Sequence, residues 1–160
     1  MIPLKRQINP PSERTFFSLL LPTEIFGERN HMENAHAKKM VAKACWWVRK
    51  NPDKWSNLRQ FCWYLKEQNE PIQRGNIYEL ARRYGMDINL ASNFRRDHNL
   101  WSVLARYLVM ESPSLLKVIC FRTTPIDEID LPQYWTDIVG RCTFQAKSLD
   151  EARKIYEANL

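Results

Sequence analysis

The chain has 160 residues and a hydrophobic content of 44%, with seven Phe, six Tyr and six Trp. This composition is sufficient for one domain with a core and excludes a wholly disordered chain. The formal net charge is +6, and no apolar run approaches the roughly eighteen residues that span a bilayer, so we expect a cytoplasmic protein with no membrane partner.

The first 32 residues show no helical or strand periodicity. Pro3, Pro10, Pro11 and Pro22 interrupt any long regular element. We therefore predict an irregular N-terminal arm over residues 1–32.

Two helices are predicted next, over residues 33–50 and 53–68. Apolar residues of the first recur with a helical period at Ala37, Met40, Val41, Ala44, Trp47 and Val48, with lysines on the opposite face. Asn51-Pro52 ends this helix and suits the first turn of the next one. The second helix offers a buried face made of Trp55, Leu58, Phe61, Cys62 and Leu65.

Residues 77–96 have the pattern of two short helices joined by a tight turn. Asn76 is a suitable N-cap for the first helix. Gly85 is suited to end it, because glycine takes the left-handed conformation at little cost. Asn89 can cap the second helix, which extends to Arg96.

The spacing of Ala81, Gly85, Ala91 and Phe94 resembles the helix-turn-helix of DNA-binding proteins, where small residues lie at the helix crossing. Ala91 and Phe94 depart from the branched aliphatic residues usual at their positions, and Tyr84 is bulky. A purely structural hairpin and a protein-binding use of the same fold are the alternatives.

The last part of the chain changes character after a predicted helix over residues 100–110, which Pro113 follows. Alternating apolar residues predict strands over 116–122 and 141–146. Between them, a short helix is predicted over 131–139, ending at Gly140. Ser148 begins a capping box for a final helix that reaches the C-terminus.

Taken together, these elements predict an α+β fold that is mainly α: a helical bundle containing a helix-turn-helix, followed by a small two-stranded β/α part. The predicted organisation is an arm (1–32), a helical domain (33–113) and a β-α-β-α subdomain (114–160).

Charge is distributed unevenly along the chain. Residues 38–59 contain seven Lys and Arg against Asp53 alone, and residues 74–106 contain six Arg against three acids. From residue 123 onward, seven acids outnumber four cations. A basic middle favours a polyanionic partner, and phosphates would repel the acidic end.

These patterns assign candidate DNA-binding residues. The second helix, 89–96, would enter the major groove of duplex DNA. Its residues away from the Ala91/Phe94 face are Asn89, Ser92, Asn93, Arg95 and Arg96. Because Asn pairs well with adenine and Arg with guanine, Asn93 and Arg96 are assigned to base edges. The candidates for phosphates are Arg74, Arg82, Arg83, and Lys39, Lys43 and Lys50 of the basic helix 38–50. Such a regulator would be a homodimer.

Catalytic motifs are absent from the sequence. It has no glycine-rich phosphate loop, no Gly-x-Ser-x-Gly turn and no His-Glu-x-x-His helix, so we expect no enzymatic activity, catalytic residues or cofactor. The widely spaced cysteines (Cys45, Cys62, Cys120 and Cys142) are predicted to be buried and reduced, and no metal site can be assembled. Asp127, Glu128 and Asp130 are predicted to form a solvated acidic loop.

The aromatic residues permit one further reading. Trp46, Trp47, Trp55, Trp63, Tyr64 and Trp101 could stack on the bases of a single strand. Their helical spacing favours packing in the core.

Three short segments carry a wider resemblance, over about residues 46–122. Asn51-Pro-Asp-Lys-Trp55, Ile88-Asn-Leu90 and Leu104-Ala-Arg-Tyr-Leu-Val-Met-Glu-Ser-Pro113 look like small helix-turn-helix proteins of bacteriophages and mobile elements, mostly without assigned activity. The resemblance implies an accessory role in a bacterial host cell. It also raises a second hypothesis, an inhibitor of a host defence complex (anti-CRISPR or anti-restriction type) that docks through the acidic C-terminal quarter.

Overall fold

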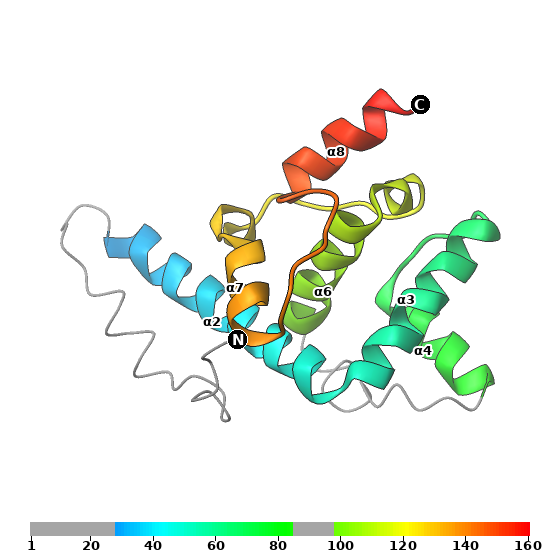
Figure 1. Cartoon of the computed structure of the whole chain (residues 1–160), viewed down its shortest axis with the longest axis horizontal. Helices are drawn as coiled ribbons and strands as arrows, with labels where there is room; N and C mark the ends of the chain where they lie inside the picture. Colours follow the sequence, from blue (N-terminus) through cyan, green and yellow to red (C-terminus); the bar gives the residue numbers. More distant parts are fainter. Residues whose placement is uncertain (1–27, 85–97) are drawn as a thin grey trace.

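The computed structural model describes residues 28–84 and 98–160, with side chains from residues 34 and 100 onward in the two segments. The described part is mainly helical and contains no strand (Figure 1). Its elements are α2 (Glu28–Lys50), α3 (Pro52–Glu67), α4 (Arg74–Arg83), α6 (His98–Glu111), the 3-10 helices η2 (Pro113–Lys117) and η3 (Pro125–Glu128), α7 (Leu131–Ile138) and α8 (Leu149–Ala158). The predicted helices over 33–50, 53–68, 100–110 and 131–139 are confirmed. The predicted irregular arm over 1–32 is wrong at its end, because α2 already begins at Glu28.

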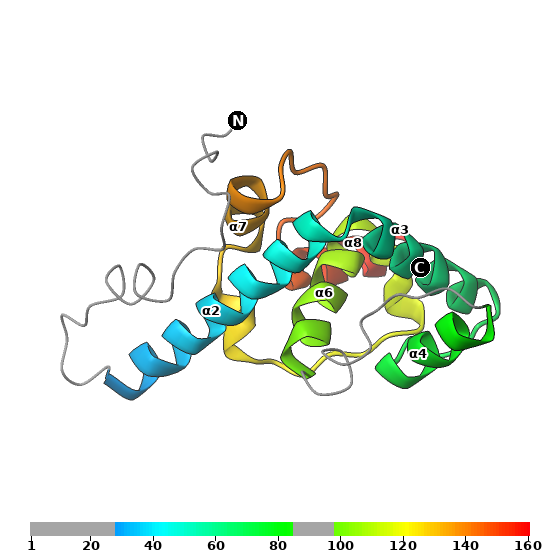
Figure 2. The ribbon, with the colours of Figure 1, turned by 90° about the horizontal axis from the view of Figure 1, so that it is seen from below.

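The centre of the molecule is formed by α2 and α6, which pack against each other. α6 is buried without interruption from Val103 to Met110. α2 also contacts α3, η3 and α7, and it crosses in front of α6 and α7 in Figure 2. One hydrophobic cluster runs through these helices and includes Ile126, Trp135 and Leu149. Residues 114–160 therefore share their core with the helices that precede them.

An aromatic group joins the early and late parts of this core. The Trp135 ring lies 5.6 Å from the Trp55 ring and 4.8 Å from the Tyr107 ring, between centroids. Phe144 packs against both Tyr107 (5.5 Å) and Trp135 (4.9 Å). Trp55 is thus a core residue, in agreement with the prediction for it.

The junction between α2 and α3 follows the sequence signal. The backbone N–H and the side-chain amide of Asn51 both donate to the Trp47 carbonyl, at 2.9 and 2.8 Å. Pro52 then occupies the first turn of α3, where its missing N–H is not needed. α3 ends before Asn69, which has a left-handed φ of 57°, and the Glu70 N–H closes the end on the Leu65 carbonyl at 2.9 Å.

The predicted N-cap of α4 is wrong. The helix begins at Arg74, with Gln73 in the N-cap position, and buries Ile77, Leu80 and Ala81. The side chain of Asn76 lies inside the first turn and donates to the Pro71 carbonyl at 2.8 Å, so it does not accept from a helix N–H. The predicted turn at Gly85 and the second helix, 89–96, lie outside the described residues.

Both predicted strands are wrong. Residues 116–122 begin within η2, and residues 141–146 have no regular structure. The alternation of burial is real, since Ile119 and Ala146 are buried while Cys120 and Gln145 are exposed. The alternation arises in irregular segments that pack against helices. Backbone carbonyls of residues 121 and 122 accept hydrogen bonds from arginine side chains, where those of a strand would accept from a neighbouring strand. Arg106 donates to the Arg122 carbonyl at 2.9 Å and Arg153 to the Phe121 carbonyl at 3.5 Å.

The last two helices begin at side-chain caps. The Asp130 carboxylate accepts from the Gln133 N–H at 3.2 Å at the start of α7. The Ser148 hydroxyl accepts from the Glu151 N–H at 3.0 Å at the start of α8, so the predicted cap at Ser148 is confirmed. The other half of the predicted capping box differs, because the Glu151 carboxylate accepts from the Lys147 N–H at 2.7 Å. Gly140 follows α7 with a φ of 148°, a conformation that favours glycine.

Candidate nucleic-acid interface

One face of α2 presents a strip of accessible side chains. The buried residues of the helix are Ala35, Ala37, Val41, Ala42, Ala44, Cys45, Trp46 and Val48. The strip, here called the α2 stripe, consists of His36, Lys39, Lys43, Trp47 and Lys50, and Lys38 and Arg49 are accessible outside it. Successive residues of an α-helix are about 100° apart, so these spacings of three and four residues place the five side chains on one face.

The α2 stripe differs from the sequence prediction at one aromatic residue. Trp47 was expected on the apolar face, but Trp46 is the buried one, with 4% of its surface exposed, and Trp47 is only partly buried. The reason is that α2 is enclosed on several sides by α3, α6, α7 and η3, so its buried face is wider than one helical stripe. An aromatic ring therefore lies among the lysines.

Arg49 is next to the α2 stripe in sequence but has a different role. Its Nη1 donates to the Ile138 carbonyl at the end of α7, at 3.0 Å. Its guanidinium also lies 5.0 Å from the centroid of the Trp46 ring, in a cation–π arrangement. Arg49 is exposed, as Lys43 and Lys50 are, but its side chain also links α2 to α7.

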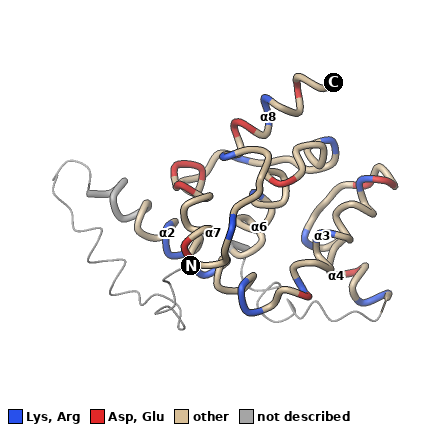
Figure 3. Tube along the Cα trace, in the orientation of Figure 1, with Lys and Arg blue, Asp and Glu red and all other residues tan. Residues whose placement is uncertain are grey.

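The C-terminal end of α4 presents a second basic group. Arg83 is exposed, and Arg82 forms an exposed ion pair with Glu79 at 2.9 Å. Tyr84, with 56% of its surface exposed, ends the described part of this segment. Figure 2 shows α2 and α4 on the same side of the molecule, and in Figure 3 the blue segments of both lie in its lower half. The acidic segments of η3 and the start of α8 lie above them.

The sequence-predicted DNA-binding residues that the structure describes therefore lie in three places. Lys39, Lys43 and Lys50 share the α2 stripe, and Arg82 and Arg83 lie at the end of α4. Arg74 lies at the other end of α4, about 14 Å away along the helix axis, where it lines a cavity with Trp101 and Arg122. Asn89, Ser92, Asn93, Arg95 and Arg96 lie outside the described residues.

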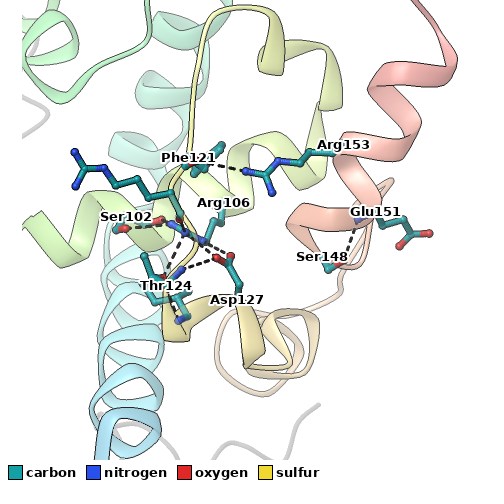
Figure 4. A network of polar contacts seen from close by, with 10 residues as sticks. Ser102, Arg106, Phe121, Thr124, Asp127, Ser148, Glu151 and Arg153 are labelled. Atoms are coloured by element: carbon teal, nitrogen blue, oxygen red, sulfur yellow. Dashed lines mark hydrogen bonds and ion pairs between the residues drawn. The ribbon is translucent and has the colours of Figure 1, made fainter. Parts of the chain in front are cut away.

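One predicted surface cation is in fact buried. Arg106, counted in the basic middle of the sequence, has 1% of its surface exposed. Its Nε and Nη2 donate to the two carboxylate oxygens of Asp127 at 2.6 and 3.1 Å. Nη1 donates to the carbonyl and hydroxyl of Ser102 at 2.9 and 3.1 Å, and Nη2 also donates to the Arg122 carbonyl (Figure 4). All five N–H groups of the guanidinium thus have acceptors.

Asp127 is correspondingly a structural residue, which corrects the prediction of a solvated acidic loop at this position. Burial opposes its ionisation, but hydrogen bonds from Arg106 and from the Thr124 N–H outweigh it and hold the pKa of Asp127 below its ordinary value. The Thr124 hydroxyl accepts from the Ile126 N–H at 3.2 Å and completes a capping box at η3. Glu128 and Asp130 are exposed, as predicted. The sequence contained no signal for a pair separated by 21 positions.

All four cysteines are free, and two of them are buried. Burial raises the pKa of the Cys45 thiol to about 12 and also raises that of Cys62. Cys45 Sγ lies 3.2 Å from the Tyr107 hydroxyl, which itself donates to the Leu131 carbonyl at 2.8 Å. Cys120 is exposed and Cys142 partly exposed, so the prediction of burial is correct for half of the set.

Comparison with protein-family models, with curated proteins and with solved structures gives no match in any of the three. Among the helices of the described residues, none has the length and apolar character needed to cross a bilayer. The same residues contain no group of three His, Cys, Asp or Glu side chains arranged to hold a metal ion.

Proposed function

We propose that this chain is a non-enzymatic protein that binds duplex DNA, as an accessory or regulatory protein of a phage or mobile element. The α2 stripe and the end of α4 would contact phosphates. Residues 89–96, which follow α4 in the chain, would supply the base contacts expected of a recognition helix.

The observation that carries this proposal is the α2 stripe. Lys39 and Lys50 are eleven residues apart, which corresponds to about 17 Å along a helix. The major groove is about 12 Å wide, so a stripe of this length can reach the phosphates on both of its sides. Trp47, among the lysines, adds a flat apolar surface suited to deoxyribose.

The first experiment measures binding of a mixed-sequence duplex by fluorescence anisotropy between about 50 and 200 mM salt. Lys43→Ala and Lys50→Ala should each weaken binding to every sequence and reduce the slope of log K against log salt by about 0.9. Lys147→Ala, an exposed lysine in the acidic part of the chain, is the matched control and should leave the slope unchanged. No duplex binding by the wild-type chain at the lowest salt would refute the proposal.

A second experiment tests base recognition. The sequence assigns Arg96 and Asn93 to base edges, so Arg96→Ala should relax preference at one position of a selected site by about 1–3 kcal/mol. The Lys50→Ala variant, selected in parallel, should keep the preference of the wild type. If Arg96→Ala weakens binding to all sequences equally, Arg96 contacts phosphate and its assignment is wrong.

A second candidate function has its own observation. Trp63 and Tyr64 of α3 have 41% and 40% of their surfaces exposed. Trp63 borders a cleft of about 260 Å³ that also includes Tyr156 and Asn159 at the end of α8. Exposed tryptophans are frequent binding hot spots, so this surface, which α3 forms with the end of α8 in the C-terminal quarter, would serve an inhibitor that docks on a host defence complex.

The two candidate functions differ in their binding partner, so one variant can distinguish them. Trp63→Ala should abolish protection of a phage from the host defence system while leaving duplex binding unchanged. Tyr84→Ala, which removes an exposed aromatic residue elsewhere, is the control. If Trp63→Ala has no effect on protection, the α3/α8 surface is not the docking site.

A further inference from the structure

A cavity of about 400 Å³ lies between the start of α4, the side of α6 and the extended segment 119–124. The backbone closes one edge of it, because the Ile72 N–H donates to the Val118 carbonyl at 2.8 Å. Its apolar and aromatic lining consists of Ile72, Trp101, Ala105, Ile119 and Phe121. A volume of this size is within the range of small-molecule sites.

Three arginines line the cavity, and they are not equivalent. Arg106 has no hydrogen-bonding capacity left, because Asp127, Ser102 and the Arg122 carbonyl already occupy its five N–H groups. In Figure 4 the side chains of Ser102, Phe121 and Thr124 surround its guanidinium, so Arg106 forms a fixed part of the wall. Arg122 is exposed and can present its guanidinium to an anion, and the half-buried Arg74 adds a second positive charge to the lining.

The aromatic walls are held in position by the same network. The Arg106 guanidinium lies 5.1 Å from the centroid of the Phe121 ring. The Phe121 carbonyl accepts from Arg153, and the Arg122 carbonyl accepts from Arg106. The segment that carries Phe121 and Arg122 is therefore fixed from both sides, and the lining of the cavity is formed before any ligand enters.

The lining indicates the chemistry of the ligand. An inorganic phosphate would use the arginines and leave Trp101 and Phe121 uncovered, whereas a neutral aromatic molecule would leave the arginines without an anion. A nucleotide has both a flat ring that stacks on aromatic side chains and a phosphate that arginine binds in bidentate fashion. Gln73 and Arg74 also begin α4, where the helix dipole favours negative charge.

We infer that this cavity is a binding site for a single nucleotide, with the base against Trp101 and Phe121 and the phosphate on Arg74 and Arg122. The nucleotide can be free or can be the phosphorylated end of a single strand. This site goes beyond the proposed duplex binding, since none of its residues belongs to the α2 stripe or to the C-terminal end of α4.

Cys120 provides the assay, because it is exposed and lines the cavity. In a Cys142→Ser background the remaining thiols, Cys45 and Cys62, are buried and have raised pKa values, so a maleimide modifies Cys120 first. The four probes are inorganic phosphate, a nucleoside, the corresponding nucleoside monophosphate and a short 5′-phosphorylated single strand. We expect slower modification with the monophosphate, the strand or both, and little change with phosphate or nucleoside alone.

Calorimetric titration of variants with the same probes identifies the residues that bind the nucleotide. Arg122→Ala should weaken binding of the monophosphate or strand by about tenfold or more. Arg141→Ala, an exposed arginine of the other extended segment, should bind like the wild type, and Lys50→Ala should lose duplex affinity only. Absence of protection by both nucleotide probes, equal protection by inorganic phosphate, or unchanged affinity in a folded Arg122→Ala variant would overturn the assignment. A preference between monophosphate and strand decides the source of the nucleotide.

Discussion

The lysines of the α2 stripe and Arg106 of α6 carry the same charge in opposite surroundings. Lys43 and Lys50 are exposed. Arg106 is buried, and each of its donors has a partner within the protein. The first group makes a surface that can attract a polyanion, and the second joins α6 to the extended segment 119–124 and to η3.

This difference limits what a count of charged residues can say. Arg106 and Asp127 add to the basic middle and the acidic end of the sequence, but neither contributes an unpaired charge to the surface. The basic character relevant to a partner therefore lies in α2 and at the end of α4.

Replacing the buried cation should have the largest effect on stability. Arg106→Ala leaves the partly buried Asp127 carboxylate without its cation and the Arg122 carbonyl without its arginine donor, so we expect a loss of about 3–5 kcal/mol in the free energy of unfolding. Urea denaturation measures it. Lys50→Ala, the exposed counterpart, should stay within about 0.5 kcal/mol of the wild type. A similarly small change for Arg106→Ala would show that the network contributes little to stability.

Acid should remove part of the same stabilisation. Because the folded pKa of Asp127 is below the ordinary value of 3.8, the unfolded chain takes up the proton first as the pH falls. The contribution of the carboxylate is complete above that value and is lost as the pH drops through the folded pKa. Asp127→Asn should be less stable at neutral pH and should depend less on pH, as measured by denaturation between about pH 6 and pH 2. Parallel pH profiles for the two proteins would contradict this.

Removal of the buried Tyr107 hydroxyl of α6 should have an intermediate effect on stability. Tyr107→Phe removes the donor to the Leu131 carbonyl and leaves Cys45 without its oxygen partner, which should cost about 1–3 kcal/mol. Thermal and urea unfolding both report it. Tyr84→Phe is the control, because Tyr84 is exposed. Equal stability of the two variants would mean that the Leu131 carbonyl finds another donor.

A smaller effect is expected at the start of α8. Ser148→Ala removes the side-chain acceptor of the Glu151 N–H and should destabilise the protein by about 1 kcal/mol. Thr143→Ala, an exposed change in the preceding extended segment, serves as its control. Ser148→Thr should restore most of the loss, and failure of this rescue would argue against a capping role.

The smallest effect should come from Arg59, whose ion pair is only partly buried. Arg59 donates to Glu111 at 2.9 Å, with 43% and 25% of the two side chains exposed. Arg59→Ala should therefore cost less than about 1 kcal/mol, and added salt should reduce the difference further. Denaturation of Arg59→Ala and Arg106→Ala at low and high salt compares the loss of stability in the two variants. A loss as large as that of Arg106→Ala would show that burial does not determine the contribution of these pairs.

Local signals in the sequence predicted much of the fold. The helical periods of α2, α3 and α6 and the cap at Ser148 depend on residues within a turn or two of one another. The two strand predictions were wrong for a physical reason. Any extended segment that packs on a core has alternating burial, and this pattern does not show whether a second strand lies beside it. The N-cap prediction for Asn76 was wrong because an asparagine near the start of a helix can also donate a hydrogen bond to the loop before the helix.

The candidate sites were less predictable than the helices. The α2 stripe depends on how many neighbours enclose α2, which decided that Trp46 would be buried. The cavity around Arg122 is built from three segments that are distant in sequence, so no single pattern indicates it. The pairing of Arg106 with Asp127 likewise appears only once α6 and η3 are packed together.

The packing of α2 against the late elements of the chain affects how the protein is made. Its apolar side chains contact η3 and α7, and Arg49 bonds to the Ile138 carbonyl, 89 positions away. During synthesis from the N-terminus, α2 leaves the ribosome long before these partners exist. Until residue 138 has emerged, the wide apolar face of α2 has only part of its cover, and this interval is when the nascent chain is most exposed to aggregation and to chaperone binding.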